Sequence, residues 1–298
     1  MRNKKKMKKL LLLCLLAVAV LGGCDRKTAE ADLQTYTYTD DYGSVVQVPA
    51  HPQRVVSLSP AVTEIMFALG ADSLLVGRTE FCVYPPEASR IENIGGISNL
   101  NIEKVLSCQP DLIISGSMVP QKVVQQFEKM GVPLVCVIEK QHFDGLFENV
   151  AKIGGLVAMD STAQQLNDRL HKRLDAIDLS PLAQPRSVYY VVGFGSGGNF
   201  TAGGNTFIND IIEMAGGQNI ASRSEGWTFS VEALLQADPE FILIRAEDSA
   251  RFCQTVPYNQ LSAVRQGRMI ALEDGILDLQ VPRNIEVIRR LRARFSQR

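Results

Sequence analysis

The sequence predicts an α/β protein with two lobes, each built on a parallel-type sheet, joined by one long backbone helix. In two blocks of the chain, short apolar strands alternate with amphipathic helices, which indicates parallel strands with helical crossovers. Between the blocks, residues 161–177 carry Leu166, Leu170 and Leu174 on one face of an otherwise polar helix. Pro181 follows this helix, which therefore separates the two blocks.

The first block begins with a hairpin whose strands, 36–39 and 45–48, alternate around a turn that contains Gly43. Ser59 is a predicted helix N-cap, because Pro60 suits the first helical position. In chain order the block then contains strand 54–58, helix 60–69, strand 74–76, helix 102–106, strand 111–115, helix 121–130, strand 134–138 and helix 143–156.

The second block repeats this pattern after the long helix. In chain order it contains strand 187–192, helix 206–214, helix 231–235, strand 241–244, strand 269–272 and helix 284–295. The predicted organisation is a tether with a hairpin over 24–52, an N-terminal lobe over 53–158, a linking helix over 159–180 and a C-terminal lobe over 181–298.

The N-terminus has the pattern of an export signal. Residues 1–9 carry six cations, residues 10–21 are an apolar run of 12, and two glycines then precede Cys24. The run is shorter than the roughly 20 residues that span a membrane, so residues 1–23 are predicted to be a signal peptide. The residues before Cys24 resemble a bacterial lipobox, which implies acylation of Cys24 and a membrane-anchored protein facing the periplasm or the cell exterior. The alternative is an ordinary secretory signal with an incidental cysteine.

The composition of the mature chain excludes some classes of function. Removing the six signal cations leaves 25 basic against 32 acidic residues, a net charge of −7, which argues against nucleic acid as a partner. Cys82, Cys108, Cys136 and Cys253 form no C-x-x-C pair and have no histidines nearby, which argues against a zinc site. The export compartment permits a disulfide, but the spacing assigns none.

Residues 193–198 fit G-x-G-x-x-G directly after a predicted strand. A dinucleotide site requires a helix that starts within the glycines, whereas residues 199–204 continue as loop, so the segment is interpreted as a flexible cleft loop. No catalytic residues are predicted, since the sequence has neither H-E-x-x-H nor G-x-S-x-G. His142 would be a haem-iron ligand if it faced the cleft, and a solvated loop histidine is the other reading.

Aromatic residues cluster in predicted loops that follow strands, where α/β sheets open their ligand crevice. They are Phe81, Tyr84, Phe194, Phe200 and Trp227. Loop aromatics supply apolar contact surface, so together they predict a broad aromatic-lined cleft. Each one alone is equally consistent with packing.

Four segments resemble the class III periplasmic binding proteins, in family order and spacing: Arg54–Glu64, Tyr84–Ala88, Asn101–Leu106 and Gln109–Ile114. This family serves ABC importers of vitamin B12, ferric siderophores and haem. The resemblance runs from Arg54 to the C-terminus. It implies two Rossmann-like lobes bridged by one long helix, with the ligand held between them and no chemistry performed.

The resemblance also implies the ligand site: Ser59, Pro60, Phe81, Tyr84, Phe194, Phe200, Trp227, Asp274 and Gly275. The B12-binding member has aromatics at several of these places, which favours a cobalt corrinoid as ligand, without any further cofactor. Ile97 stands where that member has a tryptophan, and Arg283 is the only arginine left near the 274–278 loop, which lacks that member's aromatic. Ferric siderophore and haem therefore stay open.

Glu103 and Glu232 begin short predicted helices in the two lobes and align with family glutamates that meet arginines on the permease dimer. The implied partners are that dimer with its ATPase subunits, the ligand and the membrane, and the protein is expected to be a monomer. A rival class is a cell-envelope enzyme on a doubly wound scaffold. It would require a nucleophile–base pair or a metal cluster at strand ends, and the sequence offers neither.

Overall fold

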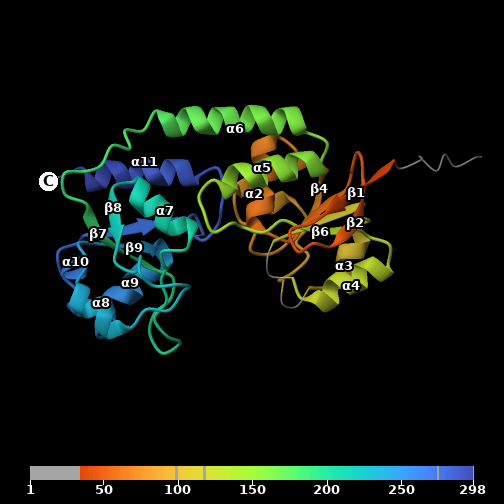
Figure 1. Ribbon diagram of the computed structural model, residues 1–298. Coiled ribbons are helices and arrows are strands. Elements are labelled where there is room, and N and C mark those ends of the chain that lie inside the picture. Colours follow the sequence, from red (N-terminus) through yellow and green to blue (C-terminus); the bar gives the residue numbers. More distant parts are fainter. Residues whose placement is uncertain (1–33, 98–99, 117–118, 274, 298) are drawn as a thin grey trace, which may run out of the picture. The chain divides into compact units, whose positions relative to one another are not determined.

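Two four-stranded parallel sheets form the framework of the computed structural model, which describes residues 34–97, 100–116, 119–273 and 275–297 (Figure 1). The first sheet has the order β4-β3-β5-β6 and the second has the order β10-β9-β7-β8. The first sheet contains β3 (Val55–Ser57), β4 (Leu75–Arg78), β5 (Leu112–Ser115) and β6 (Leu134–Cys136). The second contains β7 (Arg186–Val191), β8 (Gly217–Asn219), β9 (Phe241–Arg245) and β10 (Met269–Leu272). In chain order, each sheet therefore has its strands arranged second, first, third, fourth.

Helices connect the strands in both lobes, which confirms the predicted α/β fold. In the first lobe they are α2 (Pro60–Leu69), η1 (Asp72–Leu74), η2 (Pro86–Arg90), α3 (Ile102–Ser107), α4 (Gln121–Lys129) and α5 (Gly145–Leu156). In the second they are α7 (Phe207–Met214), α8 (Val231–Ala237), α9 (Ala246–Gln254), η3 (Tyr258–Gln260), α10 (Ser262–Arg265) and α11 (Asn284–Phe295). Within the described residues, no helix has both the length and the hydropathy needed to cross a bilayer.

Both faces of each sheet are buried, because helices cover both sides of a parallel sheet. Successive side chains point to opposite faces. In β5, Leu112 and Ile114 join one core cluster, whereas Ile113 joins a second cluster inside the first lobe. In β9, Leu243 joins the same cluster as Leu112, and Ile242 joins a third cluster inside the second lobe. One hydrophobic core thus runs through both lobes.

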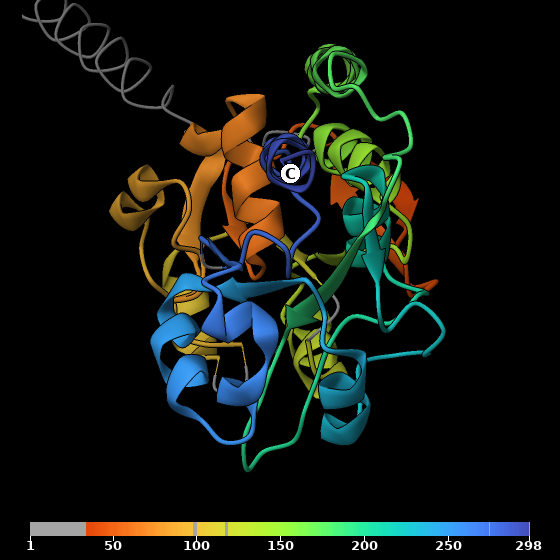
Figure 2. The same cartoon turned by 90° about the vertical axis from the view of Figure 1, so that its left-hand side faces the viewer.

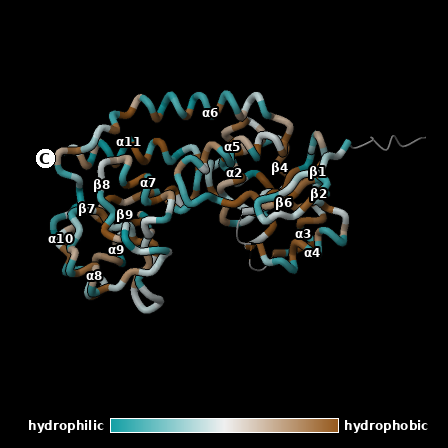
Figure 3. Tube along the Cα trace, in the orientation of Figure 1, coloured by the Kyte–Doolittle hydropathy of each residue, from teal (hydrophilic) through white to brown (hydrophobic). Residues whose placement is uncertain are grey.

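The long helix α6 (Asp160–Asp175) links the two lobes. It packs against α2 and α5 of the first lobe and against α11 of the second. Leu166 and Leu170 are buried, and the hydropathy of the helix alternates along its length (Figure 3). The predicted apolar stripe therefore faces the helices of both lobes.

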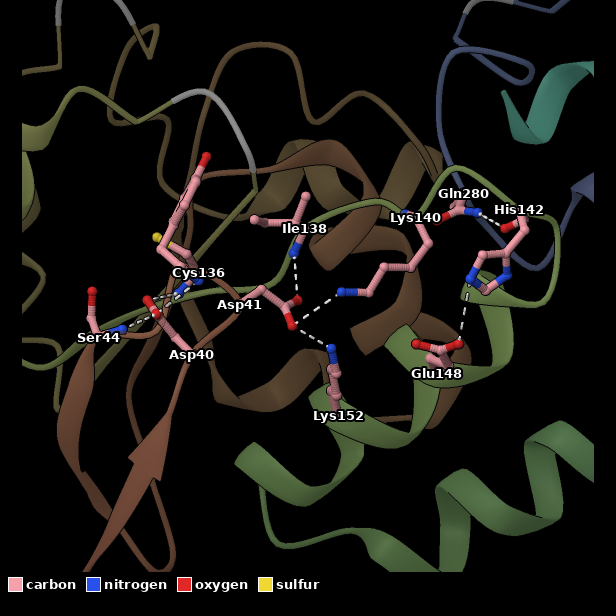
Figure 4. A network of polar contacts seen from close by, with 11 residues as sticks. Asp40, Asp41, Ser44, Cys136, Ile138, Lys140, His142, Glu148, Lys152 and Gln280 are labelled. Atoms are coloured by element: carbon pink, nitrogen blue, oxygen red, sulfur yellow. Dashed lines mark hydrogen bonds and ion pairs between the residues drawn. The ribbon is translucent and has the colours of Figure 1, made fainter. Parts of the chain in front are cut away.

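The N-terminal hairpin, β1 (Thr35–Thr39) and β2 (Val45–Pro49), is attached to the first lobe through its turn (Figure 4). The Asp40 carboxylate accepts a hydrogen bond from the backbone N–H of Cys136 at 3.3 Å. The Asp41 carboxylate pairs with the ammonium groups of Lys140, at 3.2 Å, and of Lys152. Burial acts in the opposite direction, but these bonds hold the pKa of Asp41 below its ordinary value.

The structure contains elements that the sequence pattern does not predict, chiefly β8, α9 and α10. Strand β8 has the sequence Gly-Gln-Asn and pairs with β7 at the sheet edge, without the apolar residues that announce a strand. Helix α9 buries only Phe252, so its apolar periodicity is weak. Cys82, Cys108, Cys136 and Cys253 are free thiols, and Cys108 and Cys136 are buried among apolar side chains.

Candidate ligand-binding cleft

A cavity of about 390 Å³ is lined by residues from both lobes. Pro60 and Phe81 lie just beyond the carboxyl ends of β3 and β4, and Arg245 and Gly275 lie at or beyond those of β9 and β10. Ligands of open α/β sheets bind at this end of the strands. The cavity therefore lies where the fold predicts a ligand.

The apolar part of the wall comes mainly from the loop that follows β4. Phe81 is 57% exposed and Val83 is 65% exposed, although both are large apolar side chains. Tyr84 of the same loop and Leu279 of the second lobe complete this surface. Exposed apolar side chains grouped in a concavity are typical of a binding surface.

The floor of the cavity holds an ion pair between the lobes. Arg283, next to α11, donates from Nε and Nη2 to both carboxylate oxygens of Glu64 on α2, at 2.8–2.9 Å. Burial raises the pKa of Glu64, and the adjacent guanidinium acts in the opposite direction. The Arg283 guanidinium also lies over the Tyr84 ring, 3.7 Å from its centroid, in a cation–π arrangement. The pair thus fixes both the floor and one aromatic side of the cavity.

A second ion pair lies on the wall of the second lobe. Arg245 donates from Nε to Asp278 at 2.8 Å, and the Tyr190 hydroxyl donates to the other oxygen of that carboxylate at 2.7 Å. Burial raises the pKa of Tyr190 well above its ordinary value, and the charge of Asp278 adds to the shift. Tyr190 therefore stays protonated and remains a donor. Both arginines that line the cavity are bound to carboxylates of the protein.

The structure brings part of the predicted ligand site together. Pro60, Phe81, Tyr84 and Gly275 line the cavity. Ser59 is the buried N-cap of α2, next to Pro60, as the sequence predicts. Asp274 and Cys24, the predicted lipidation site, lie outside the described residues.

Phe194, which the sequence predicts to be a cleft aromatic, does not line the cavity. It is buried in the core of the second lobe, edge-on to Phe252 and Tyr258, with ring centroids 5.0 and 5.7 Å away. Phe200 packs against the backbone of the 193–198 glycine loop, and Trp227 is exposed; neither lines the cavity. Helix α7 starts only at Phe207, well beyond these glycines, as the interpretation against a dinucleotide site requires.

Hydrogen bonds join two short loops, one from each lobe (Figure 4). The backbone N–H of Lys140 donates to Oε1 of Gln280 at 2.6 Å, and the Gln280 amide donates to the carbonyl of His142 at 2.7 Å. Burial raises the pKa of Glu139 to about 7, the charge of Asp278 adds to this, and the Gln280 backbone N–H opposes it. Nε2 of His142 lies 3.8 Å from Oε1 of Glu148, and His142 does not line the cavity.

Glu103 and Glu232 occupy equivalent places in the two lobes. Each is exposed and is the second residue of a short helix that leads to the third strand of its sheet, α3 before β5 and α8 before β9. The N-cap of each helix is formed by a side chain: Asn101 accepts from the Lys104 N–H, and Ser230 accepts from the Ala233 N–H. Figures 1 and 2 show α3 and α8 on the side of the sheets away from α6.

The charged residues of the cavity were not predicted from the sequence as part of the ligand site. They are Glu64, Glu80, Arg245, Glu247, Asp278 and Arg283. The sequence could have indicated Glu64. It lies among Val62, Ile65 and Met66 on the apolar face of a helix, and a charge that is buried there requires a partner. Within the described part of the chain, no three metal-ligating side chains come together as a metal site.

Comparisons with known proteins agree with this geometry. A family model described as a periplasmic binding protein matches residues 55–274. The cobalamin-binding protein of Halobacterium salinarum strain R1 is 29% identical over 276 residues, which covers 87% of this chain and 73% of the relative. The uncharacterized ABC transporter substrate-binding lipoprotein YvrC of Bacillus subtilis is 27% identical over 294 residues, 93% of each chain. The apo form of the periplasmic heme-binding protein RhuT from Roseiflexus sp. RS-1 aligns with a TM-score of 0.71 and 27% identity, covering 82% of this chain and 97% of RhuT.

Proposed function

The chain belongs to the periplasmic binding protein family, and on that premise we propose that it is a lipid-anchored protein that captures a corrinoid for an ABC importer. The family is one of binding proteins, so the chain is not an enzyme. In this proposal the ligand lies between the lobes and is passed to the membrane permease. A large, mostly rigid ligand held between two preformed surfaces binds without a large ordering cost.

The observation that carries the choice of ligand is that both arginines lining the cavity are paired with carboxylates of the protein. Arg245 and Arg283 are already paired with Asp278 and Glu64, so their positive charges are balanced before a ligand binds. Haem carries two propionates and many ferric siderophores are anionic, whereas the side chains around a corrin ring are uncharged amides, apart from the phosphodiester of the nucleotide loop. The apolar side formed by Phe81 and Tyr84 suits the face of a corrin ring. The name of the Halobacterium relative supports the same choice.

The test is a titration of the purified ligand-free protein with cyanocobalamin, haemin and a set of ferric siderophores, followed by the change in tryptophan fluorescence and by calorimetry. We expect saturable binding of one cyanocobalamin per chain and weaker binding of the anionic ligands. Tight binding of haemin with none of cyanocobalamin would contradict the corrinoid proposal.

The proposed anchor predicts that Cys24→Ser prevents acylation. Stable anchoring requires more than one acyl chain, and the lipobox cysteine is where these chains would be attached. We expect the variant to accumulate as precursor or to leave the membrane fraction, as measured by fractionation and metabolic labelling with palmitate. Cys14→Ser, which changes the only other cysteine of the first 24 residues, is the matched control and should remain labelled. Labelling of Cys24→Ser in the membrane fraction would refute the anchor.

The proposed docking to the permease predicts that Glu103→Ala with Glu232→Ala reduces transport without changing ligand affinity. One exposed carboxylate per lobe would orient the protein on a permease dimer, since complementary charges fix the register of a complex. Uptake by cells that carry the double variant is compared with the affinity of the purified variant. Glu87→Ala with Glu213→Ala, two other exposed glutamates, is the control. Wild-type uptake in the docking variant would exclude this role.

A further inference from the structure

Two carboxylates in the wall of the cavity have no partner among the residues that the structure describes. Glu80 follows β4 in the first lobe, and Glu247 lies in the first turn of α9 in the second lobe. Both side chains are exposed, and in the part of the chain that the structure describes neither carboxylate has a hydrogen bond or ion pair. They approach the cavity from different lobes.

These carboxylates give the cavity an excess of negative charge. Its described lining contains four carboxylates and two guanidiniums, and each guanidinium is bound to one carboxylate, Arg283 to Glu64 and Arg245 to Asp278. Glu80 and Glu247 remain. A carboxylate can only accept hydrogen bonds, so it stabilises a ligand that offers N–H or O–H donors or a positive charge and repels a ligand anion.

Helix stability alone does not account for Glu247. A carboxylate in the first turn favours a helix, but α9 already has Asp248 in that turn, where it pairs with Arg251 at 2.6 Å. Glu80 belongs to no helix or strand. It lies in the turn after β4 and lines the cavity. The feature that the two carboxylates share is their place in the cavity wall.

We propose that Glu80 and Glu247 determine ligand selectivity, by accepting hydrogen bonds from amide groups at the periphery of the ligand and by repelling ligands with carboxylates there. This inference rests on the proposed function and extends it, because it assigns the choice between neutral and anionic ligands to one residue from each lobe. The bound carboxylates, Glu64 and Asp278, take no part in this selection.

The experiment compares two corrinoids that differ in one group. Cyanocobalamin is titrated against a cyanocobalamin monocarboxylic acid, in which one peripheral propionamide is hydrolysed to a carboxylate. The wild type should prefer the amide by about tenfold or more, since a hydrogen bond to a charged group is replaced by repulsion. The Glu80→Gln, Glu247→Gln double variant should bring the ratio close to one, and added salt should reduce it in the wild type. Glu87→Gln with Glu213→Gln, which removes the same charge elsewhere on the surface, should leave the ratio unchanged.

An unchanged ratio in the Glu80→Gln, Glu247→Gln variant would overturn the inference while leaving corrinoid binding intact. If the wild type binds haemin and not cyanocobalamin, the proposed function fails instead, and the same variants are titrated with haemin and its uncharged dimethyl ester. Selection by Glu80 and Glu247 then requires that the wild type prefer the ester and that the double variant lose this preference. Equal preferences in wild type and variant would exclude it with this ligand also.

Discussion

Glu64→Ala is expected to lower the free energy of unfolding by about 3–5 kcal/mol, the loss typical of breaking a buried ion pair on one side. Glu64 is 4% exposed, and its carboxylate binds the Arg283 guanidinium through two donors. Alanine leaves that guanidinium without its main partner in a partly buried place. Glu273 lies 3.6 Å from Arg283 but is exposed, so it compensates little. Urea unfolding measures the change.

The matched control is an exposed ion pair on α11, the helix that begins next to Arg283. Glu286→Ala removes the partner of Arg289, and both side chains are exposed, so the loss should stay below about 1 kcal/mol. Replacing Glu64 and Arg283 together by methionine should recover much of the stability, because both buried charges then disappear. If Glu64→Ala costs no more than Glu286→Ala, the pair does not hold the lobes together.

Glu139→Gln is expected to increase stability at pH 8 and to leave it nearly unchanged at pH 5. Burial raises the pKa of Glu139 to about 7 from an ordinary 4.5. A carboxyl with a raised pKa in the folded state contributes fully below its unfolded pKa, and the contribution is lost as pH rises from about 4.5 to about 7. The corresponding loss for the wild type is on the order of 3 kcal/mol. Glutamine cannot ionise and still accepts the Gln280 backbone N–H.

The measurement is the free energy of unfolding in urea at pH 5, 6.5 and 8 for the wild type and the variant. Their difference should grow through this range, and Glu87→Gln, at an exposed position, should follow the wild type throughout. Parallel curves for the wild type and Glu139→Gln would show that Glu139 is ionised in the folded protein at all three values.

Strong local patterns explain why most of the fold was predictable. The helix at Pro60 begins and ends where Ser59 and Gly70 indicate, with Gly70 in the left-handed region at φ 73°. The strands of both sheets are short apolar runs because helices cover both of their faces. Strand β8 could not be predicted, since it depends on pairing with β7 and not on its own residues.

The candidate site was less predictable, because its geometry depends on contacts between distant segments. Phe81 and Tyr84 were predicted as cleft aromatics, and they line the cavity. Phe194 was predicted from its loop position, yet Phe252 and Tyr258 arrive from far along the chain and bury it. The pairing of Glu64 with Arg283 spans both lobes, and no local pattern encodes it.

The repeated strand order of the two sheets has a consequence for assembly. Each half of the protein offers a similar short helix with a glutamate at its second position, Glu103 in α3 and Glu232 in α8. A two-fold symmetric partner would therefore meet nearly equivalent contacts in two orientations related by a half-turn. Among the described residues, the β1–β2 hairpin belongs to the first lobe alone, where Asp41 binds Lys140 and Lys152. The hairpin is thus one feature that makes these two orientations distinguishable.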